Sequence, residues 1–183
     1  MNEKYTKGAV VLHWLVAVGI LFNLVTMLVV DDKARTRDFI NMHKSVGITV
    51  LLLVLMRLLW RAANKPPAPL ASLHGWERTL SKAVHYSLYL LIVLMPLTGW
   101  LQDSAFKDAA KYPLTLFGVV PWFRLPPFAT MDPVAKEHWH HIFGVTHSLV
   151  LKIALWIALG LHLAGALKHQ FLDKQRELQR MWF

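Results

Sequence analysis

Four long apolar runs, separated by polar segments, dominate the hydrophobic pattern of the chain. They cover about residues 9–30, 39–61, 83–101 and 142–167, and the first contains no charged residue over 22 positions. The hydrocarbon core of a membrane is about 30 Å thick, so a helix of roughly 20 apolar residues crosses it once. None of the runs alternates between apolar and polar positions as a barrel strand would. The sequence therefore predicts an all-α membrane protein, a four-helix bundle formed by one domain over residues 1–183.

The composition agrees with a membrane protein and excludes several kinds of site. Hydrophobic residues make up 55% of the 183 residues, charged residues make up 17%, and the mean hydropathy is +0.39. The absence of cysteine excludes disulfide scaffolds, iron–sulfur clusters and thioether-attached haem. The basic residues behind the formal net charge of +9 lie between the apolar runs rather than along one face. We therefore expect membrane lipid, and not nucleic acid, as the partner of this surface.

The basic residues also predict how the helices are oriented. Eleven Lys and Arg residues lie on the side that carries both termini, and eight lie on the opposite side. Cytoplasmic segments of membrane proteins carry the larger number of Lys and Arg residues. The count therefore predicts that both termini are cytoplasmic.

Five histidines lie in or at the edge of the apolar runs, where an ionisable side chain is costly and marks a candidate functional site. They are His13, His43, His85, His147 and His162. The fourth run carries two of them, 15 residues or about 22 Å apart along a helix. With alternating helix directions, His13 lies at the depth of His162 and His43 at the depth of His147. The sequence thus predicts two histidine pairs, one near each membrane face.

Two neutral imidazoles are suitable axial ligands for a haem iron and leave no open position on it. A flat porphyrin needs small residues one helical turn away from each ligand. Three of the four histidines have them, namely Ala9, Ala17, Gly47, Ala158, Gly165 and Ala166, whereas His147 has Gly144 on one side only. These features favour two haems. Two alternatives remain open: ordinary hydrogen bonding and packing between helices, and a metal ion, although no acidic residue lies inside any run to help bind it.

Several stretches of the chain resemble the bacterial four-helix dihaem cytochrome b561 family. They are VLHWLVA at 11–17, INMHKSVGI at 40–48, VHYSLYLLIVLMPLTGW at 84–100, LHLAGALKHQF at 161–171 and DKQRELQRM at 173–181. The resemblance implies a multi-pass protein of the bacterial inner membrane with two non-covalent b-type haems. It implies that His13 and His162 ligate one haem iron, and that His43 and His147 ligate the other.

The fourth run departs from this family at one position. Family members usually separate its two histidines by 14 residues, whereas here Ser148 stands at that position and the histidine comes one residue earlier. A local bulge in the helix would absorb the additional rotation of about 100°. His85 also matches a family position, and we interpret it as a residue beside a haem or a quinone.

Two cationic side chains each allow two interpretations. Lys152, inside the fourth run, either extends its stem to the outer interface or pairs its ammonium group with a haem propionate. Arg57, near the end of the second run, either anchors that helix at the cytoplasmic face or contacts a propionate.

The resemblance implies electron transfer across the inner membrane to or from the quinone pool, with ubiquinone as the electron partner. One such role is an oxidoreductase of the superoxide:ubiquinone type that oxidises superoxide at the outer face. The other is an electron-transferring membrane anchor for a partner dehydrogenase or a periplasmic redox protein. Asp31, Asp32 and Asp38 offset most of the nearby positive charge, which weakens the steering of superoxide. A haem-free helical transporter is the alternative from another class, and it predicts no visible absorbance.

Overall fold

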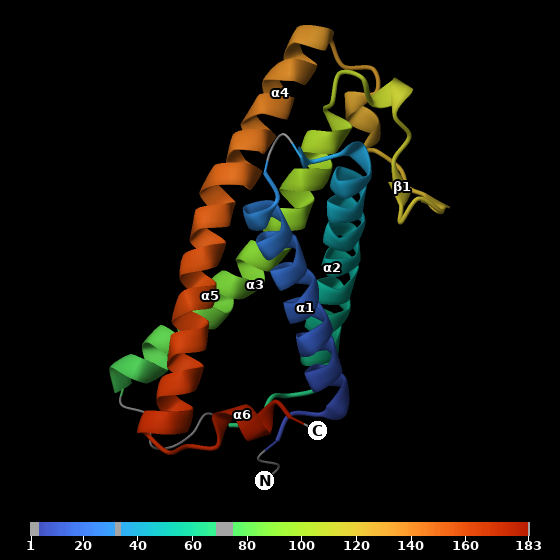
Figure 1. Cartoon of the computed structure of the whole chain (residues 1–183). Coiled ribbons are helices and arrows are strands. Elements are labelled where there is room, and N and C mark those ends of the chain that lie inside the picture. Colours follow the sequence, from blue (N-terminus) through green and yellow to red (C-terminus); the bar gives the residue numbers. More distant parts are fainter. Residues whose placement is uncertain (1–3, 32–33, 69–74, 183) are drawn as a thin grey trace.

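The computed structural model describes residues 4–31, 34–68 and 75–182 and contains four long helices (Figure 1). They are α1 (Lys7–Val29), α2 (Arg37–Ala63), α3 (Gly75–Ser104) and a fourth helix of 40 residues that runs from Pro133 to Leu172 in several sections. Within the described residues, these four helices are long and apolar enough to cross a membrane. The predicted all-α, four-helix membrane fold is therefore confirmed.

The two described ends of the chain lie at the same end of the bundle, as four crossings require (Figure 1). We call this end the inner end and the opposite one the outer end. The assignment of the inner end to the cytoplasm stays a prediction from the distribution of basic residues.

α1 and α2 are antiparallel neighbours that pack closely against each other. The hydroxyl groups of Thr6 and Thr36 cap their first turns by accepting hydrogen bonds from backbone N–H groups. The close approach of the two helices depends on Gly19, because a Cβ atom there would lie 2.5 Å from Cγ2 of Val50. α2 extends two residues beyond the predicted apolar run at each end.

α3 begins at Gly75, eight residues before the apolar run that predicted it. Its first turns are held by polar contacts: Glu77 is buried and accepts a hydrogen bond of 2.7 Å from Nζ of Lys168. A search for apolar runs misses a helix start of this kind. Pro96 lies inside α3, where it removes one backbone hydrogen bond.

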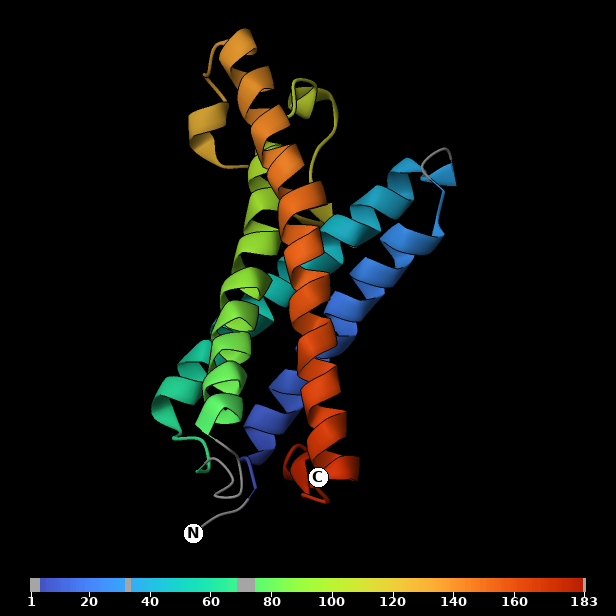
Figure 2. The same ribbon diagram turned by 90° about the vertical axis from the view of Figure 1, so that its left-hand side faces the viewer.

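The fourth helix consists of two α-helical sections, each followed by a π-helical one. In chain order they are α4 (Pro133–Val145), η4 (Thr146–Leu151), α5 (Lys152–Leu167) and η5 (Lys168–Leu172). α4 begins nine residues before the predicted run because the carboxylate of Asp132 caps it and Pro133 occupies the first helical position. Its first turns rise beyond the outer ends of α1 and α2, as Figure 2 shows. The short helix α6 (Glu177–Arg180) follows near the C-terminus.

Side chains from all four long helices form a small apolar core where the helices meet. Its buried members are Val16, Leu24, Val50, Val54, Leu91, Ile92, Leu151, Leu155 and Ala158. Many other large apolar side chains are exposed; Leu28 and Leu59, for example, are 71% and 72% exposed. Apolar surface of this extent is unfavourable in water and is expected where helices face lipid.

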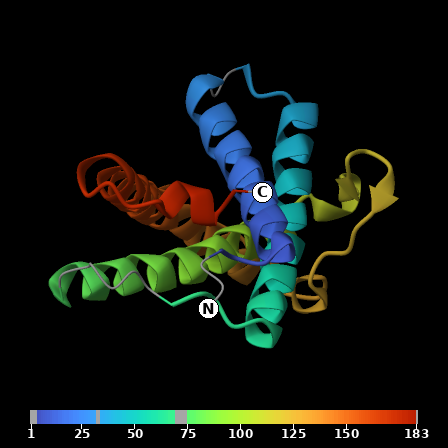
Figure 3. The same ribbon diagram turned by 90° about the horizontal axis from the view of Figure 1, so that it is seen from below.

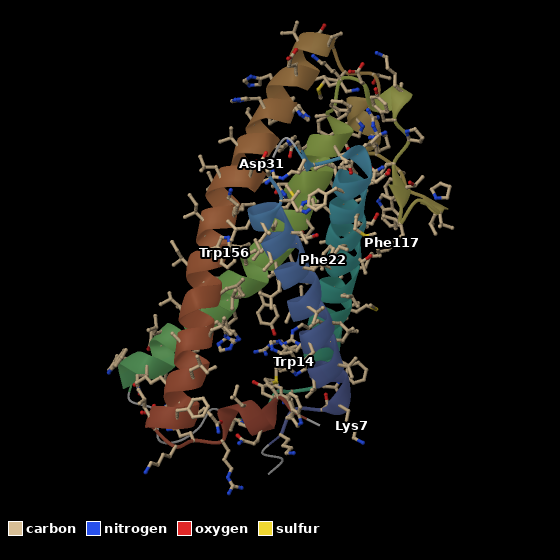
Figure 4. The ribbon with its side chains drawn as sticks, in the orientation of Figure 1. Lys7, Trp14, Phe22, Asp31, Phe117 and Trp156 are labelled. Carbon is tan, nitrogen blue, oxygen red and sulfur yellow. The ribbon has the colours of Figure 1, made fainter. Side chains whose placement is uncertain are left out.

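Residues 105–132, between α3 and α4, fold into a compact segment at the outer end. They form two short 3₁₀ helices, η2 (Ala109–Lys111) and η3 (Pro126–Phe128), and an antiparallel hairpin of β1 (Thr115–Leu116) and β2 (Val120–Pro121). Phe117, labelled in Figure 4, lies at the hairpin turn and is half exposed.

One buried carboxylate ties this segment to the helices. The side chain of Asp103 is 6% exposed and accepts hydrogen bonds from Nζ of Lys44 at 2.6 Å and from Nε of Arg124 at 2.8 Å. Arg124 also donates to the backbone carbonyl groups of Ala109 and Tyr112. The end of α3, α2 and the 105–132 segment therefore meet at a single ion cluster.

Candidate functional site

The outer end holds the first predicted histidine pair. His43 on α2 and His147 in η4 face each other, with ring centroids 6.1 Å apart and ring planes at 87°. Both residues are half-buried between the helices. The structure thus brings together two residues that lie more than 100 positions apart in the sequence.

The backbone of α3 holds the imidazole of His147 in place. Nδ1 of His147 lies 2.8 Å from the carbonyl oxygen of Met95. A carbonyl oxygen only accepts, so Nδ1 carries the proton and the lone pair of the neutral ring lies on Nε2. Gly99 makes the approach possible, because a Cβ atom there would lie 2.9 Å from Cε1 of His147. This is the way that metal-ligating histidines are usually oriented.

The additional residue of the fourth helix is absorbed at His147 itself. The π-helical section η4 spans Thr146–Leu151 and includes His147 and Ser148. A π-helical turn holds one more residue than an α-helical turn, so it removes the rotation of about 100° that one additional residue introduces. The local bulge that the histidine spacing predicts is therefore present.

Asn23 on α1 lies against the backbone of His43, and the sequence reasoning missed it. Its Nδ2 donates a hydrogen bond of 3.2 Å to the carbonyl oxygen of His43. Oδ1 of Asn23 and Nδ1 of His43 are both buried without a hydrogen-bond partner among the described residues. Unsatisfied polar atoms are costly in a membrane core, and they often mark a functional site. The sequence did offer a signal for this residue, because Asn23 is a single amide side chain within the first apolar run.

The inner end holds three histidines rather than two. The ring centroids of His13 on α1 and His162 on α5 are 6.3 Å apart, with ring planes at 70°. His85 on α3 is also near, with its centroid 5.2 Å from that of His162. Nδ1 of His85 donates to the carbonyl oxygen of Ser81 at 2.7 Å. The predicted pair of His13 and His162 is thus formed, and His85 lies directly beside it.

The spacing of both pairs fits two imidazoles on one haem iron. A metal–imidazole bond is about 2.0 Å long, so rings on opposite sides of one metal ion have centroids about 6 Å apart. The pairs His43–His147 and His13–His162 match this value at 6.1 and 6.3 Å. The separation of 5.2 Å between His85 and His162 is too short for that arrangement.

The small residues predicted beside the histidines differ in how much room they leave. A Cβ atom at Gly165, one turn after His162, would meet no atom within 4 Å. At Gly144, one turn before His147, a Cβ atom would lie 2.9 Å from Nε2 of Gln102. The space beside Gly165 is therefore open, whereas the space at Gly144 is occupied by a glutamine.

A cavity of about 300 Å³ opens at the inner end, and its lining includes Ala9 and Tyr89, each one helical turn from a histidine of that end. Four cationic residues line it, Lys4, Arg57, Arg61 and Lys65, together with the aromatic residues Tyr5, Trp60 and Tyr89. The described lining contains no acidic residue. Arg57 lines the cavity and donates a hydrogen bond of 2.9 Å to the carbonyl oxygen of Ala9, one helical turn before His13. The cavity therefore favours a flat molecule with oxygen acceptors or negative charge.

Comparison with known proteins agrees with this arrangement. The sequence model of the prokaryotic cytochrome b561 family matches residues 4–183. The chain belongs to this family. It is 31% identical over 185 residues to cytochrome b561 homolog 2 of Escherichia coli (strain K12), which covers 98% of this chain and 91% of that relative. It is 24% identical over 184 residues to the probable superoxide oxidase CybB of Yersinia pestis, covering 99% of this chain and 97% of that relative.

As a cytochrome b561, the chain is a bacterial multi-pass membrane protein that binds b-type haem and transfers electrons. The two cations weighed in the sequence lie in different surroundings in this cytochrome b561. Arg57 donates a hydrogen bond of 2.9 Å to the carbonyl oxygen of Ala9 and lines the inner cavity. Lys152 is exposed on α5 and forms no ion pair with a described residue.

Proposed function

We propose that this cytochrome b561 binds two b-type haems, one at each histidine pair, and transfers electrons across the bacterial inner membrane. The observation that carries this proposal is the presence of two imidazole pairs with centroids about 6 Å apart at opposite ends of one bundle. His147 and His162 lie on the same helix, so that helix contributes one ligand to each haem. The termini and the inner pair face the cytoplasm in this proposal.

The haems supply one-electron chemistry when bound, and the protein sets their ligation and their surroundings. His43 and His147 would hold the outer haem, and His13 and His162 would hold the inner one. The hydrogen bond from Nδ1 of His147 to the carbonyl oxygen of Met95 would leave the Nε2 lone pair of that ring free to bind iron.

We assign His85 to a supporting role rather than to the ligand set. Its ring lies too close to that of His162 for the two to bind opposite sides of one iron. Its Nδ1 is held by the carbonyl group of Ser81, which leaves Nε2 for a second polar group at the inner end. A quinone oxygen or a haem propionate has the right chemistry for that contact.

We place the quinone in the inner cavity. Arg57 and Arg61 offer donors for the carbonyl oxygens and for the negative charge of a reduced ring, while Trp60 and Tyr89 offer aromatic surface. A volume of about 300 Å³ lies at the lower end of the range of small-molecule pockets. Ubiquinone is the expected electron partner in a bacterial inner membrane.

Superoxide is a second candidate, as the electron donor at the outer end. The observation that favours it is the likeness to the Yersinia pestis relative, whose name is probable superoxide oxidase. Lys44 lies next to His43, but its charge is paired with Asp103. Reduction of the haems by a superoxide-generating system, and its suppression by superoxide dismutase, would distinguish this donor from a protein partner.

The proposal is tested by the reduced-minus-oxidised visible spectrum of the detergent-purified protein, with haem counted per polypeptide. We expect two low-spin b-type haems in the unmodified protein and one in each of the variants His147→Ala and His162→Ala. His138→Ala is the matched control, because His138 is an exposed histidine of the same long helix outside both pairs. A folded protein without haem, or two haems in either ligand variant, would contradict the proposal.

A further inference from the structure

The C-terminal segment folds back under the bundle after the fourth helix ends. Figure 3 shows α6 lying across the inner end beside α1. The reversal is held at Asp173, whose carboxylate accepts hydrogen bonds from Nζ of Lys168 at 2.8 Å and from Nδ1 of His169 at 2.7 Å. These two contacts, that with Lys168 first, hold the pKa of Asp173 below its usual value of 3.8. The carboxylate is therefore charged throughout the physiological pH range, and the reversal is maintained.

Arg180, in the last turn of α6, is buried although it carries a charge. Its Nη2 donates a hydrogen bond of 2.7 Å to the carbonyl oxygen of Ala68, and its own carbonyl oxygen accepts one of 3.2 Å from the backbone N–H of Tyr5. Its guanidinium carbon also lies 5.9 Å from the centroid of the Tyr5 ring. One residue of the tail thus contacts two segments that are more than 60 positions apart in the sequence.

Both of these segments are walls of the inner cavity. Tyr5 and Ala68 line it, and neither lies within a helix, since Tyr5 precedes α1 and Ala68 follows α2. The backbone of each wall therefore lacks the regular hydrogen bonds that hold a helix in place. The hydrogen bonds to Arg180 therefore join the two walls to each other at the inner end of the bundle.

The residues after Arg180 attach the tail to α1 as well. Nε1 of Trp14 donates a hydrogen bond of 2.9 Å to the carbonyl oxygen of Met181, and the rings of Trp14 and Trp182 meet edge to face at 6.1 Å. The ring of Trp14 also contacts the ring of His13, with centroids 5.4 Å apart. Trp14, which Figure 4 labels near the inner end, therefore contacts both the tail and one histidine of the inner pair.

We propose that Arg180 is a positioning residue for the inner cavity, which joins the Tyr5 and Ala68 walls and so fixes their separation on either side of a quinone ring. The identity of the occupant rests on the proposed function. The positioning of the walls rests on the contacts of Arg180 with Ala68 and Tyr5. Arg180 does not touch the occupant, so it sets the affinity of the cavity rather than the rate of electron transfer once the cavity is filled.

The test compares Arg180→Gln with the unmodified protein in two measurements. In quinone reduction with a short-chain ubiquinone analogue, we expect KM to rise about tenfold with kcat and haem content unchanged, since a hydrogen bond from a charged donor commonly contributes a factor of this size. The second measurement uses the absence of cysteine from the chain. A single reporter, Asn64→Cys, places a thiol in the cavity lining, and we expect a maleimide to label it several times faster when Arg180 is replaced.

Two further variants separate the contact from the charge. Arg176→Gln removes a positive charge from an exposed position of the same tail, and it should change neither KM nor labelling. Arg180→Lys keeps the positive charge and a donor for the Ala68 carbonyl group. In this variant, KM and the labelling rate should lie between those of the unmodified protein and those of Arg180→Gln. The proposal is overturned if Arg180→Gln leaves the labelling rate unchanged or if Arg176→Gln has the same effect. If the unmodified protein reduces no quinone, the proposed function fails, while the labelling rates still decide the role of Arg180.

Discussion

The outer and inner histidine pairs have almost the same spacing but very different surroundings. At the outer end, two histidines are enclosed between helices, and the 105–132 segment is tied over that end by the ion cluster of Asp103. At the inner end, a third histidine, His85, joins the pair, and a cavity rich in cations lies beside it. The two pairs thus have nearly equal ring spacings, but only the inner pair lies close to a third histidine and a cavity lined by cations.

In the proposed dihaem protein, this difference suggests that the two ends exchange electrons in different ways. At the outer end, the recorded cavity of about 200 Å³ is lined by Phe106, Lys107, Glu137 and His140 and by neither histidine of the pair, which suits a partner that stays outside. At the inner end, the larger cavity of about 300 Å³ is lined by cationic and aromatic side chains, which suits a partner that enters and binds. We therefore expect changes at the outer end to affect haem binding and stability, and changes at the inner end to affect the binding of a small molecule.

The largest expected effect is the loss of the proposed haem at the inner end, where three histidines lie close together and two of them are proposed as ligands. His13→Ala should remove the inner haem completely and leave the outer one, because the remaining rings of His85 and His162 are too close to bind opposite sides of one iron. His85→Ala should retain both haems. Haem content and the reduced-minus-oxidised spectrum measure both outcomes. If His85→Ala lost a haem and His13→Ala retained both, His85 would be the ligand and His13 the supporting residue.

The next prediction concerns the outer end and the π-helical section η4. Deletion of Ser148 should keep both haems, since η4 then closes into an ordinary α-helical turn and His147 stays opposite His43. Insertion of one alanine after Ile157 should remove the outer haem, because η4 already absorbs one additional residue and the outer half would rotate by about 100°. Haem counts on the two variants provide the measurement, and an insertion variant with two haems would contradict this account of η4.

The smallest effect is expected at the ion cluster of the outer end. Asp103→Asn leaves Lys44 and Arg124 without their common anion, and these side chains are 29% and 18% exposed. Because solvent screens both cations in part, we expect a loss of about 2 kcal/mol in the free energy of unfolding. The change should appear as a lower thermal midpoint and as faster proteolysis within residues 105–132.

Asp108→Asn is the control for that variant. Asp108 forms its ion pair with Lys111 in the same segment, but both side chains are well exposed. Exposed pairs contribute little, so the control should not change the thermal midpoint measurably. Equal effects of the two variants would show that the cluster at Asp103 has no particular importance.

The sequence was informative where membrane burial restricts the residue types. Apolar runs predicted all four helices, and the depth of His13, His43, His147 and His162 predicted which of them meet, because helix length and direction determine depth. The histidine spacing even predicted a bulge, and η4 provides it. The early start of α3 was missed, since it depends on an ion pair between Glu77 and a residue 91 positions later.

Polar contacts between distant segments could not be predicted for the same reason. Asp103, Lys44 and Arg124 each appear as an ordinary charge beside an apolar run, and only the fold brings them together. Arg180 appeared as one more basic residue of a tail, although it is buried against Ala68. Such partners cannot be predicted from the local sequence, because their positions depend on how the helices pack.

The distance between the two histidine pairs has an energetic consequence in a living membrane. His147 and His162 are 15 residues apart, about 22 Å along a helix, which is about three quarters of the hydrocarbon thickness. Moving one charge across a whole membrane changes its free energy by about 2.3 kcal/mol for each 100 mV of membrane potential. In the proposed dihaem protein, an electron that passes between the pairs would therefore gain or lose about 1.7 kcal/mol per 100 mV. The membrane voltage would then favour one direction of electron transfer over the other.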